Sequence, residues 1–209
     1  MKLSVYNIEG KETSKTVSLN KDIFGIEPND HAIYLDVKNY LAAQRQGTHK
    51  SKERSDVTGS RRKIRKQKGS GAARVGDIKN PLFRGGGRVF GPRPRSYDFK
   101  LNKKVKVLAR KSALSQIAKD NKMIILEDFS METPSTKDFA KILSNLDQTN
   151  NKTLLILTDS IKNILLSSRN LKKTKVVNVS SINTYDLMNA HKLMFVESSI
   201  KEIEKNYKN

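Results

Sequence analysis

Cysteine is absent from this chain of 209 residues. The chain can therefore form no disulfide, no thiolate zinc site and no cysteine nucleophile. Long apolar runs are also missing, since no stretch approaches the roughly 18–20 residues that a membrane-spanning helix requires. The first residues, Met1–Tyr6, contain no apolar run of the kind that marks a signal peptide. We therefore expect a soluble protein of a reducing compartment, with the cytoplasm as its location.

Apolar and acidic residues are both scarce. Hydrophobic residues make up 36% of the chain, whereas about 45–50% is usual for globular proteins when glycine is counted. Either the core is small or part of the chain belongs to no core. Lys and Arg number 41 against 21 acids, which gives a formal net charge of +20. Such a charge says little about the fold, but it predicts polyanionic partners and salt-sensitive binding.

The excess positive charge is concentrated in one segment, Arg45–Asp98, which we call the basic segment. Its 54 residues include 16 Lys and Arg but only four acids, so its balance of +12 exceeds half the net charge. It also contains nine of the 11 glycines, and its few large apolar residues follow no 3.6 or 2.0 period. Such a segment cannot bury enough apolar surface to offset the entropy cost of ordering, so we expect it to be disordered on its own.

Strands and helices are predicted on both sides of the basic segment. Before it we expect strands at Leu3–Tyr6 and Val17–Leu19, and a helix from about Asn29 or Asp30 with Ile33 and Leu41 on one face. After it, the apolar runs typical of strands covered on both faces are Met123–Leu126, Leu154–Leu157, Val176–Val177 and Leu193–Val196. Helix starts are expected at Asn102, Ser135, Asp159 and Ser199, with a further short helix near Tyr185.

This alternation predicts an α/β fold, a single three-layer domain with a mainly parallel sheet. Residues 1–44 and 99–209 would form the globular domain. Residues 45–98 would form a long extended basic loop inserted into it.

The run Ser60–Lys68 contains six cations among nine residues. A charge run is usually a solvated face, but this one lies in a Gly-rich segment with few balancing acids, which favours nucleic-acid backbone as its partner. Arg offers phosphate a planar fork of donors and Lys a mobile point charge. RNA is favoured over DNA because no helix-turn-helix, zinc-finger or basic-zipper pattern is present. The residues expected to bind RNA are Arg45, Lys50, Lys52, Arg54, Arg61, Arg62, Lys63, Arg65, Lys66, Lys68, Arg74, Lys79, Arg84, Arg88, Arg93 and Arg95.

The glycines of the basic segment do not form a nucleotide-binding loop. Gly69–Arg74 has Arg at the third glycine position of the dinucleotide fingerprint, no strand precedes it, and no P-loop pattern occurs in the chain. A flexible linker is the simplest alternative, but the flanking Phe83-Arg84 and Arg88–Phe90 are not linker composition. We instead expect backbone without side chains that approaches RNA closely or turns with positive φ at Gly69, Gly71, Gly85, Gly86 and Gly87.

Patterns for catalysis are weak. The only histidines are His31, His49 and His191, and none has metal-ligand spacing. Glu127-Asp128 follows an apolar run, where α/β enzymes place carboxylates, but adjacent strand residues point to opposite faces. We therefore predict no enzymatic activity, no cofactor and no metal.

An ordered set of short motifs resembles a known family. The motifs are Arg45–Thr48, Thr58–Ser60, Gln67–Gly71 with Ala73-Arg74, Pro81–Gly87, Phe90–Pro94 and Lys103–Ser115. Each alone is unspecific. Together, and dense over Arg45–Ser115, they resemble the bacterial type of the L4/L1e family of large-subunit ribosomal proteins.

The resemblance implies a globular domain on the outside of the large subunit and a loop that reaches inward. The loop tip, about Arg61–Gly71, would line the nascent-peptide exit tunnel near the macrolide site, and the protein would contribute to early subunit assembly. The implied partners are large-subunit rRNA, neighbouring ribosomal proteins and the nascent peptide, with no membrane, and the location is cytoplasmic and ribosome-bound. The implied tunnel-tip residues are Arg65, Lys66, Gln67, Lys68 and Gly69.

The tip departs from the family at one place. Relatives usually have a Lys-Pro-Trp-Arg-like stretch where this chain has Lys63-Ile64-Arg65-Lys66. Without Pro and Trp, the tip conformation and its aromatic contact are expected to differ.

Two other functions remain open from the sequence. A free-standing RNA chaperone or translational regulator would carry the same basic loop. An RNA-modifying enzyme would hold a cofactor in the α/β domain, but it needs a Gly-rich strand–helix turn there, and the sequence has none.

Overall fold

A computed structural model describes residues 2–158 and 162–207. The described residues form two compact units. The first, which we call the sheet unit, comprises the residues up to Leu41 and those from Lys100 onward. The second, the basic unit, is Ala42–Phe99 and includes the basic segment. That residues 45–98 act as a separate loop domain in solution stays a prediction.

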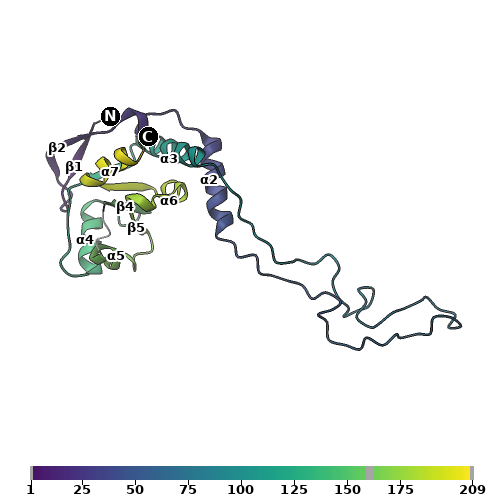
Figure 1. Cartoon of the computed structure of the whole chain (residues 1–209). Helices are drawn as coiled ribbons and strands as arrows, with labels where there is room; N and C mark the ends of the chain where they lie inside the picture. Colours follow the sequence, from purple (N-terminus) through teal and green to yellow (C-terminus); the bar gives the residue numbers. More distant parts are fainter. Residues whose placement is uncertain (1, 159–161, 208–209) are drawn as a thin grey trace. The chain divides into compact units, whose positions relative to one another are not determined.

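A six-stranded sheet forms the centre of the sheet unit (Figure 1). Its strand order is β2-β1-β3-β6-β4-β5. Only β1 and β2 pair antiparallel, and every other pairing is parallel. The prediction of an α/β fold with a mainly parallel sheet is confirmed. The strands are β1 (Lys2–Tyr6), β2 (Glu12–Ser18), β3 (Met123–Leu126), β4 (Thr153–Leu157), β5 (Thr174–Asn178) and β6 (Lys192–Val196).

The continuous apolar runs form strands because both faces of the sheet are covered. Along β4, Leu154 and Ile156 belong to one buried apolar cluster, whereas Leu155 and Leu157 belong to another. Successive strand residues point to opposite faces, so the two clusters are the two sides of the sheet. Each strand residue can then be apolar without being exposed to water.

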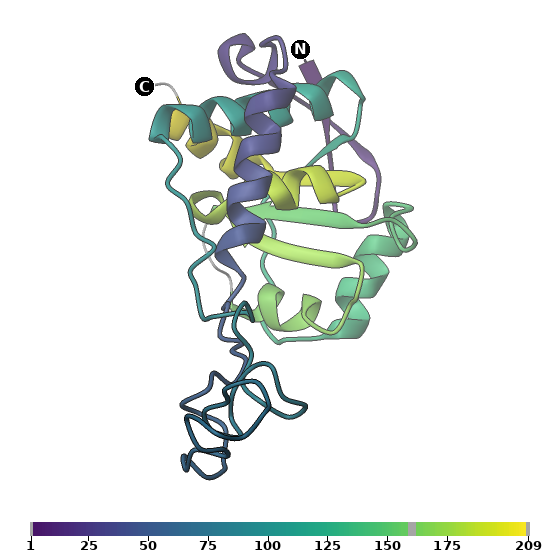
Figure 2. The same cartoon turned by 90° about the vertical axis from the view of Figure 1, so that its right-hand side faces the viewer.

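Helices cover the two faces unequally (Figure 2). One cluster contains side chains of α4 and α5, and the other contains those of α1, α2, α3, α6 and α7. Helix, sheet and helix thus form three layers. The helices are α1 (Lys21–Phe24), α2 (Asp30–Ala43), α3 (Lys103–Lys119), α4 (Thr136–Asn145), α5 (Lys162–Ser168), α6 (Thr184–Asn189) and α7 (Glu197–Tyr207), with a short 3-10 turn, η1 (Val179–Ser181).

The predicted helix starts fare differently. Ser135 is the N-cap of α4, and its hydroxyl accepts a hydrogen bond from the Asp138 backbone N–H at 3.3 Å. Asn102 precedes α3 as expected, but its side chain makes no capping hydrogen bond. The predicted start at Asp159 lies outside the described residues.

The predicted start of the last helix at Ser199 is wrong. α7 begins at Glu197, directly after β6, so Ser199 lies inside its first turn. The Ser199 hydroxyl is fully buried and donates to the Val196 carbonyl at 2.6 Å. It therefore serves the strand–helix junction in place of an N-cap. Among the helices that the structure describes, none is both long and apolar enough to cross a membrane.

Candidate nucleic-acid interface

The basic unit is built from chain without regular secondary structure. Residues 44–102, all of which the structure describes, contain no helix or strand. The unit has two arms, a first that includes residues 47–52 and a second that includes residues 88–95. The arms run antiparallel and are joined by few backbone hydrogen bonds. The N–H of Arg95 donates to Gly47 (3.1 Å), that of Ser51 to Pro92 (3.0 Å) and that of Arg88 to Lys52 (2.9 Å).

Three of the four acids in the basic segment pair with its own cations. The pairs are Arg54–Asp77 (3.1 Å), Arg93–Glu53 (2.8 Å) and Lys50–Asp56 (2.9 Å). The hydrogen bond from Lys50 lowers the pKa of Asp56 below its usual range. These pairs connect stretches of chain while most of the positive charge of the unit stays uncompensated.

A tyrosine between two arginines fixes the place where the two arms come together. The Arg45 guanidinium carbon lies 3.7 Å from the Tyr97 ring centroid, and that of Arg95 lies 4.6 Å from it. Hydrogen bonding by Arg95 lowers the pKa of the Tyr97 hydroxyl. Gly47 is required beside them, because a Cβ there would lie 2.1 Å from the Arg95 carbonyl oxygen. A guanidinium stacked on a ring still presents donors at its edge, so both arginines can also meet phosphate.

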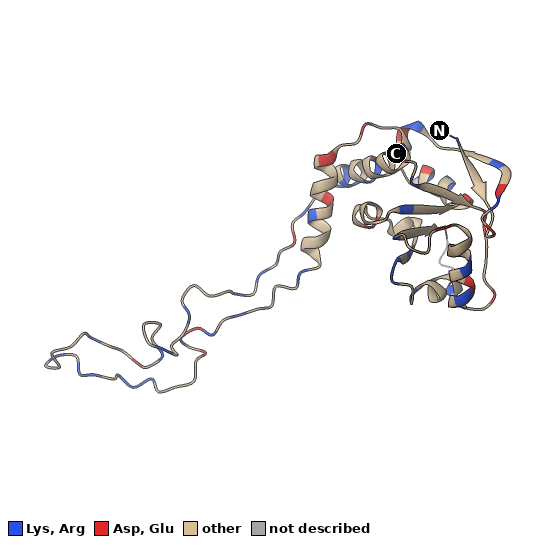
Figure 3. Ribbon diagram, turned by 180° about the vertical axis from the view of Figure 1, so that it is seen from behind, with Lys and Arg blue, Asp and Glu red and all other residues tan. Residues whose placement is uncertain are grey.

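Of the sixteen cations predicted to bind RNA, fifteen are exposed. They occur along both arms (Figure 3). The tip residues Arg65–Gly69 are all exposed as well. Lys79 is the exception, with a relative exposure of 7%. Its side chain is covered by the unit itself, so in this structure Lys79 does not present itself to a partner.

Four of these cations converge although they are distant in the sequence. Arg54, Arg61, Lys63 and Arg74 line a hollow of about 410 Å³, together with the carboxylate of Asp77. Backbone pairing explains the convergence, because the Ile64 N–H donates to the Gly76 carbonyl at 2.9 Å. A surplus of guanidinium groups around one hollow suits the oxygens of a phosphate.

The five glycines singled out from the sequence fall into two groups. Gly69, Gly71 and Gly85 have φ of +80°, +59° and +82°, and a Cβ at any of them would meet open space. By contrast, a Cβ at Gly86 would lie 2.0 Å from the Asn80 carbonyl oxygen, and one at Gly87 would lie 2.4 Å from the backbone nitrogen of Arg54. The close approach at Gly86 and Gly87 is therefore to the unit's own backbone, whereas the other three leave backbone open to a partner.

The structure also exposes apolar side chains that the sequence reasoning did not assign to binding. Phe90 is 100% exposed and Leu82 is 89% exposed. Phe90 stands between Arg88 and Arg93 in the sequence, and an aromatic residue interleaved with arginines is the signal that could have identified it. An exposed ring beside guanidinium groups can stack on an unpaired base while the cations meet the flanking phosphates.

The carboxylates after β3 have separate partners. Glu127 pairs with Lys15 at 3.0 Å, and Asp128 accepts from the Ser198 hydroxyl at 2.6 Å. The two carboxylates are thus engaged in different contacts. Within the described ranges, no group of three or more His, Cys, Asp and Glu side chains could hold a metal ion.

Comparison with known proteins shows the family of the chain. A profile of the Ribosomal protein L4/L1 family matches residues 17–206. The chain is 59% identical over 208 residues to the large ribosomal subunit protein uL4 of Parabacteroides distasonis, covering 100% of both chains. It is 58% identical over 204 residues to the uL4 of Cytophaga hutchinsonii, covering 98% of both, and 57% identical over 206 residues to that of Flavobacterium johnsoniae, covering 99% of both. This chain therefore belongs to the ribosomal protein L4/L1 family.

Proposed function

We propose that this chain, which is a structural constituent of the large ribosomal subunit, binds large-subunit rRNA through its basic unit. As a ribosomal protein of this family it is not an enzyme. The observation that carries the proposal is the exposure of fifteen cations on a unit that has no apolar core of its own. Such a surface is suited to binding a polyanion. For a ribosomal protein, the polyanion at hand is rRNA.

Binding would proceed chiefly by neutralisation of phosphates. Each Lys or Arg that meets a phosphate releases condensed counterions, which makes affinity steeply dependent on salt. The length of the segment supports deep penetration, because about 27 residues per arm at ~3.3 Å each span at most roughly 90 Å. The hollow at Arg54, Arg61 and Arg74 offers a place for one phosphate group, and Phe90 offers a surface for one base.

The tip residues Arg65, Lys66, Gln67, Lys68 and Gly69 would line the nascent-peptide exit tunnel. Their exposure and the open backbone at Gly69 and Gly71 support this. The chain would then contact the nascent peptide and neighbouring ribosomal proteins, contribute to subunit assembly, and reside on ribosomes in the cytoplasm. Lys63-Ile64-Arg65-Lys66 would give the tip its own shape, since Pro and Trp are missing there.

Sedimentation separates this function from its first rival. We expect the protein to co-sediment with the large subunit after a high-salt wash, because its arms would be enclosed by folded rRNA. A free-standing RNA chaperone or translational regulator would dissociate and remain near the top of a sucrose gradient. Recovery of the protein only in the light fractions would contradict the proposal.

Cross-linking tests the tunnel contact directly. A photoreactive amino acid at position 67 should cross-link to the nascent chain of a stalled ribosome. The same group at position 201, on α7 of the sheet unit, serves as the matched control and should give no such product. Equal cross-linking yields at positions 67 and 201 would contradict the proposal that the tip lines the tunnel.

A further inference from the structure

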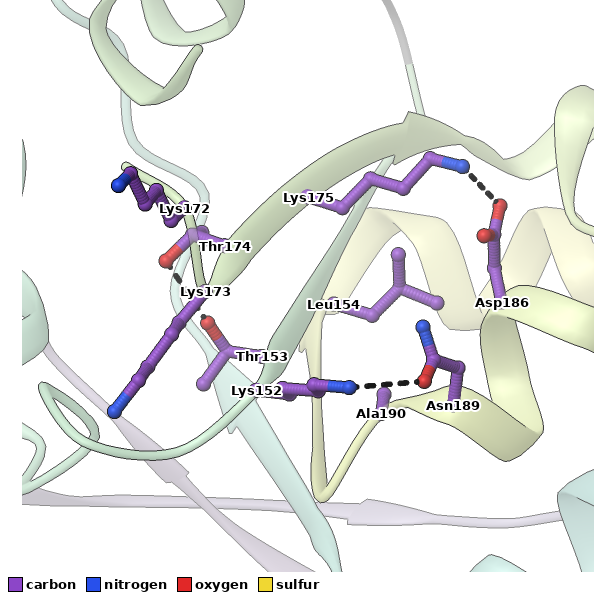
Figure 4. Close-up of a pocket in the computed structure, with 10 residues that line it drawn as sticks. All are labelled: Lys152, Thr153, Leu154, Lys172, Lys173, Thr174, Lys175, Asp186, Asn189 and Ala190. Atoms are coloured by element: carbon purple, nitrogen blue, oxygen red, sulfur yellow. Dashed lines mark hydrogen bonds and ion pairs between the residues drawn. The ribbon is translucent and has the colours of Figure 1, made fainter. Parts of the chain in front are cut away.

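A second group of cations lies in the sheet unit, around a hollow of about 280 Å³ (Figure 4). It is located where β4 and β5 begin, at Thr153 and Thr174. These two threonines are partners in the β4–β5 pairing, and the Thr153 hydroxyl donates to that of Thr174 at 3.2 Å. The four lysines that line the hollow are Lys152, Lys172, Lys173 and Lys175.

The parallel pairing of β4 and β5 brings these lysines together. Lys152 directly precedes β4, while Lys172 and Lys173 directly precede β5. Figure 4 shows Lys152 and Lys175 extending toward α6, with Lys172 and Lys173 on the other side of the hollow. Residues that are 20 positions apart in the sequence thus share one surface.

Only one of the four charges is neutralised by the residues that line the hollow. Lys175 pairs with the buried carboxylate of Asp186 at 2.6 Å. Lys152 donates to the Asn189 side-chain oxygen at 3.2 Å, and Lys173 donates to the Asn150 carbonyl at 2.9 Å, and both of these acceptors are neutral. Each ammonium group carries three donors, so a hydrogen bond to a neutral acceptor leaves its charge and further donors available.

The lining of the hollow indicates what it would hold. Its apolar side chains are Leu154 and Ala190, and among its lining residues none is aromatic. A base would therefore find no ring to stack on, and the volume lies just below the roughly 300–1,000 Å³ usual for small-molecule sites. Mobile lysine point charges beside a threonine hydroxyl fit the oxygens of a passing phosphodiester.

We propose that this lysine-lined hollow is a second RNA-backbone site, carried by the sheet unit. It goes beyond the proposed function, which assigns RNA binding to the basic unit. The cluster Lys172-Lys173-Thr174-Lys175 is visible in the sequence, but Lys152 joins it only through the pairing of β4 with β5.

The test compares two pairs of substitutions in the full chain. Lys172→Gln with Lys173→Gln removes two charges from the hollow. Lys201→Gln with Lys205→Gln removes two exposed charges from α7 and is the matched control. Affinity for a transcript of the large-subunit rRNA is measured over a salt series, and thermal unfolding is recorded for each variant.

A lysine that contacts phosphate contributes about one to the slope of log affinity against log salt. We expect the slope of the Lys172/Lys173 variant to become shallower by about 2, with unfolding unchanged, and that of the control to stay the same. Equal slopes in both pairs and the parent would overturn the proposal. So would normal RNA binding combined with poor incorporation into subunits, because that result would indicate an acidic protein as the partner.

A variant with the tip cations replaced, measured in parallel, keeps this test separate from the proposed function. If the hollow variant loses slope and the tip variant does not, the second site stands and the assignment to the basic unit fails. If only the tip variant loses slope, the reverse holds.

Discussion

The two units of this chain are stabilised by different interactions. In the sheet unit, side chains such as Ile125, Leu155 and Phe195 are almost fully buried between the sheet and its helices. In the basic unit the only buried side chains are those of Asp77 and Lys79. Apolar burial contributes about 25 cal/mol for each Å², whereas exposed ion pairs contribute roughly 0–1 kcal/mol each. The sheet unit therefore has its own source of stability, whereas the basic unit buries too little of its own chain to be stabilised in the same way.

The comparison also shows what the few acids of the basic unit do. Asp77, Glu53 and Asp56 each connect to a cation on another part of the segment. These pairs restrict the shapes that the arms can take, although they add little free energy. A partly restricted polycation loses less conformational entropy on binding than a fully flexible one.

Hydrogen exchange in the free protein should give the largest contrast between the units. Amides in the central strands β3, β4 and β6 should be protected to the full free energy of unfolding, about 5–15 kcal/mol for a domain. Amides of residues 45–98 should exchange almost as fast as in an unfolded chain, because few of them are hydrogen-bonded and no apolar core covers them. Strong protection of the Arg88 or Ser51 amide without RNA would contradict the claim that the basic unit has little stability of its own.

Replacing the tip cations should affect binding and leave folding unchanged. The variant carries Gln at positions 61, 62, 63, 65, 66 and 68. Since each phosphate contact contributes about 0.7–0.9 to the salt slope, the slope for rRNA should become shallower by about 4 to 5. Over a rise from 50 to 200 mM salt, the parent should lose up to about a thousandfold more affinity than the variant, or about 4 kcal/mol.

The control for this variant keeps the charge and changes only its chemistry. Lys in place of Arg61, Arg62 and Arg65 should preserve the slope, with weaker binding where the guanidinium fork is used. Unfolding of the sheet unit should be the same in all three proteins. A lower unfolding midpoint in the Gln variant would show that the tip belongs to the core.

Two phenylalanines provide a matched test of apolar side chains. Phe195 is fully buried, and its ring meets Phe24 edge-on with centroids 6.5 Å apart. Phe195→Ala should lower the free energy of unfolding by about 3–5 kcal/mol. Phe90→Ala should change it by less than about 0.5 kcal/mol, because the ring is fully exposed. Denaturant titration measures both.

Affinity for rRNA, in contrast to the free energy of unfolding, should depend on Phe90. Phe90→Ala should lower rRNA affinity by about 1–3 kcal/mol if the ring stacks on a base. Phe90→Tyr keeps an aromatic surface and should retain most of the affinity. If Phe90→Ala binds as the parent does, the exposed ring serves another contact.

The layers of the sheet unit could be predicted from the sequence, because a strand covered on both faces must be continuously apolar. The burial of individual polar residues could not. Asp36 of α2 is buried, and the hydroxyl of Thr184, 148 positions away, donates to it. Leu41 was expected on the buried face of the same helix but is 44% exposed. Both outcomes depend on where α6 and the end of α2 lie in the fold, which local patterns do not contain.

In the candidate interface, too, some features could be predicted from local sequence, whereas others depend on how the chain folds. Charge density is a local property, so the exposed cations of the basic segment could be identified from composition alone. The burial of Lys79 and the contacts at Gly86 and Gly87 depend on where the chain of the segment folds back. Likewise, the lysines at the start of β4 and β5 line one hollow only because the two strands pair.

The smallest predicted difference concerns two serines that make similar hydrogen bonds. The Ser135 hydroxyl accepts from the Asp138 N–H at 3.3 Å in the sheet unit, and the Ser60 hydroxyl accepts from the Arg62 N–H at 3.1 Å in the basic unit. Ser135→Ala should lower the free energy of unfolding by about 1 kcal/mol, since it removes a helix N-cap. Ser60→Ala should leave it unchanged, because unfolding of the sheet unit does not involve that turn.

The dependence on pH adds a second way to read the Ser135 result. The hydrogen bond from Ser135, aided by Lys141, holds the pKa of Asp138 below its usual value. A carboxylate with a depressed pKa stabilises the fold above its unfolded pKa, and that contribution is lost as the pH falls through the folded pKa. The difference in stability between Ser135→Ala and the parent should therefore be present at neutral pH and shrink in acid. A difference that stays constant from neutral pH down to strong acid would assign it to the backbone hydrogen bond alone.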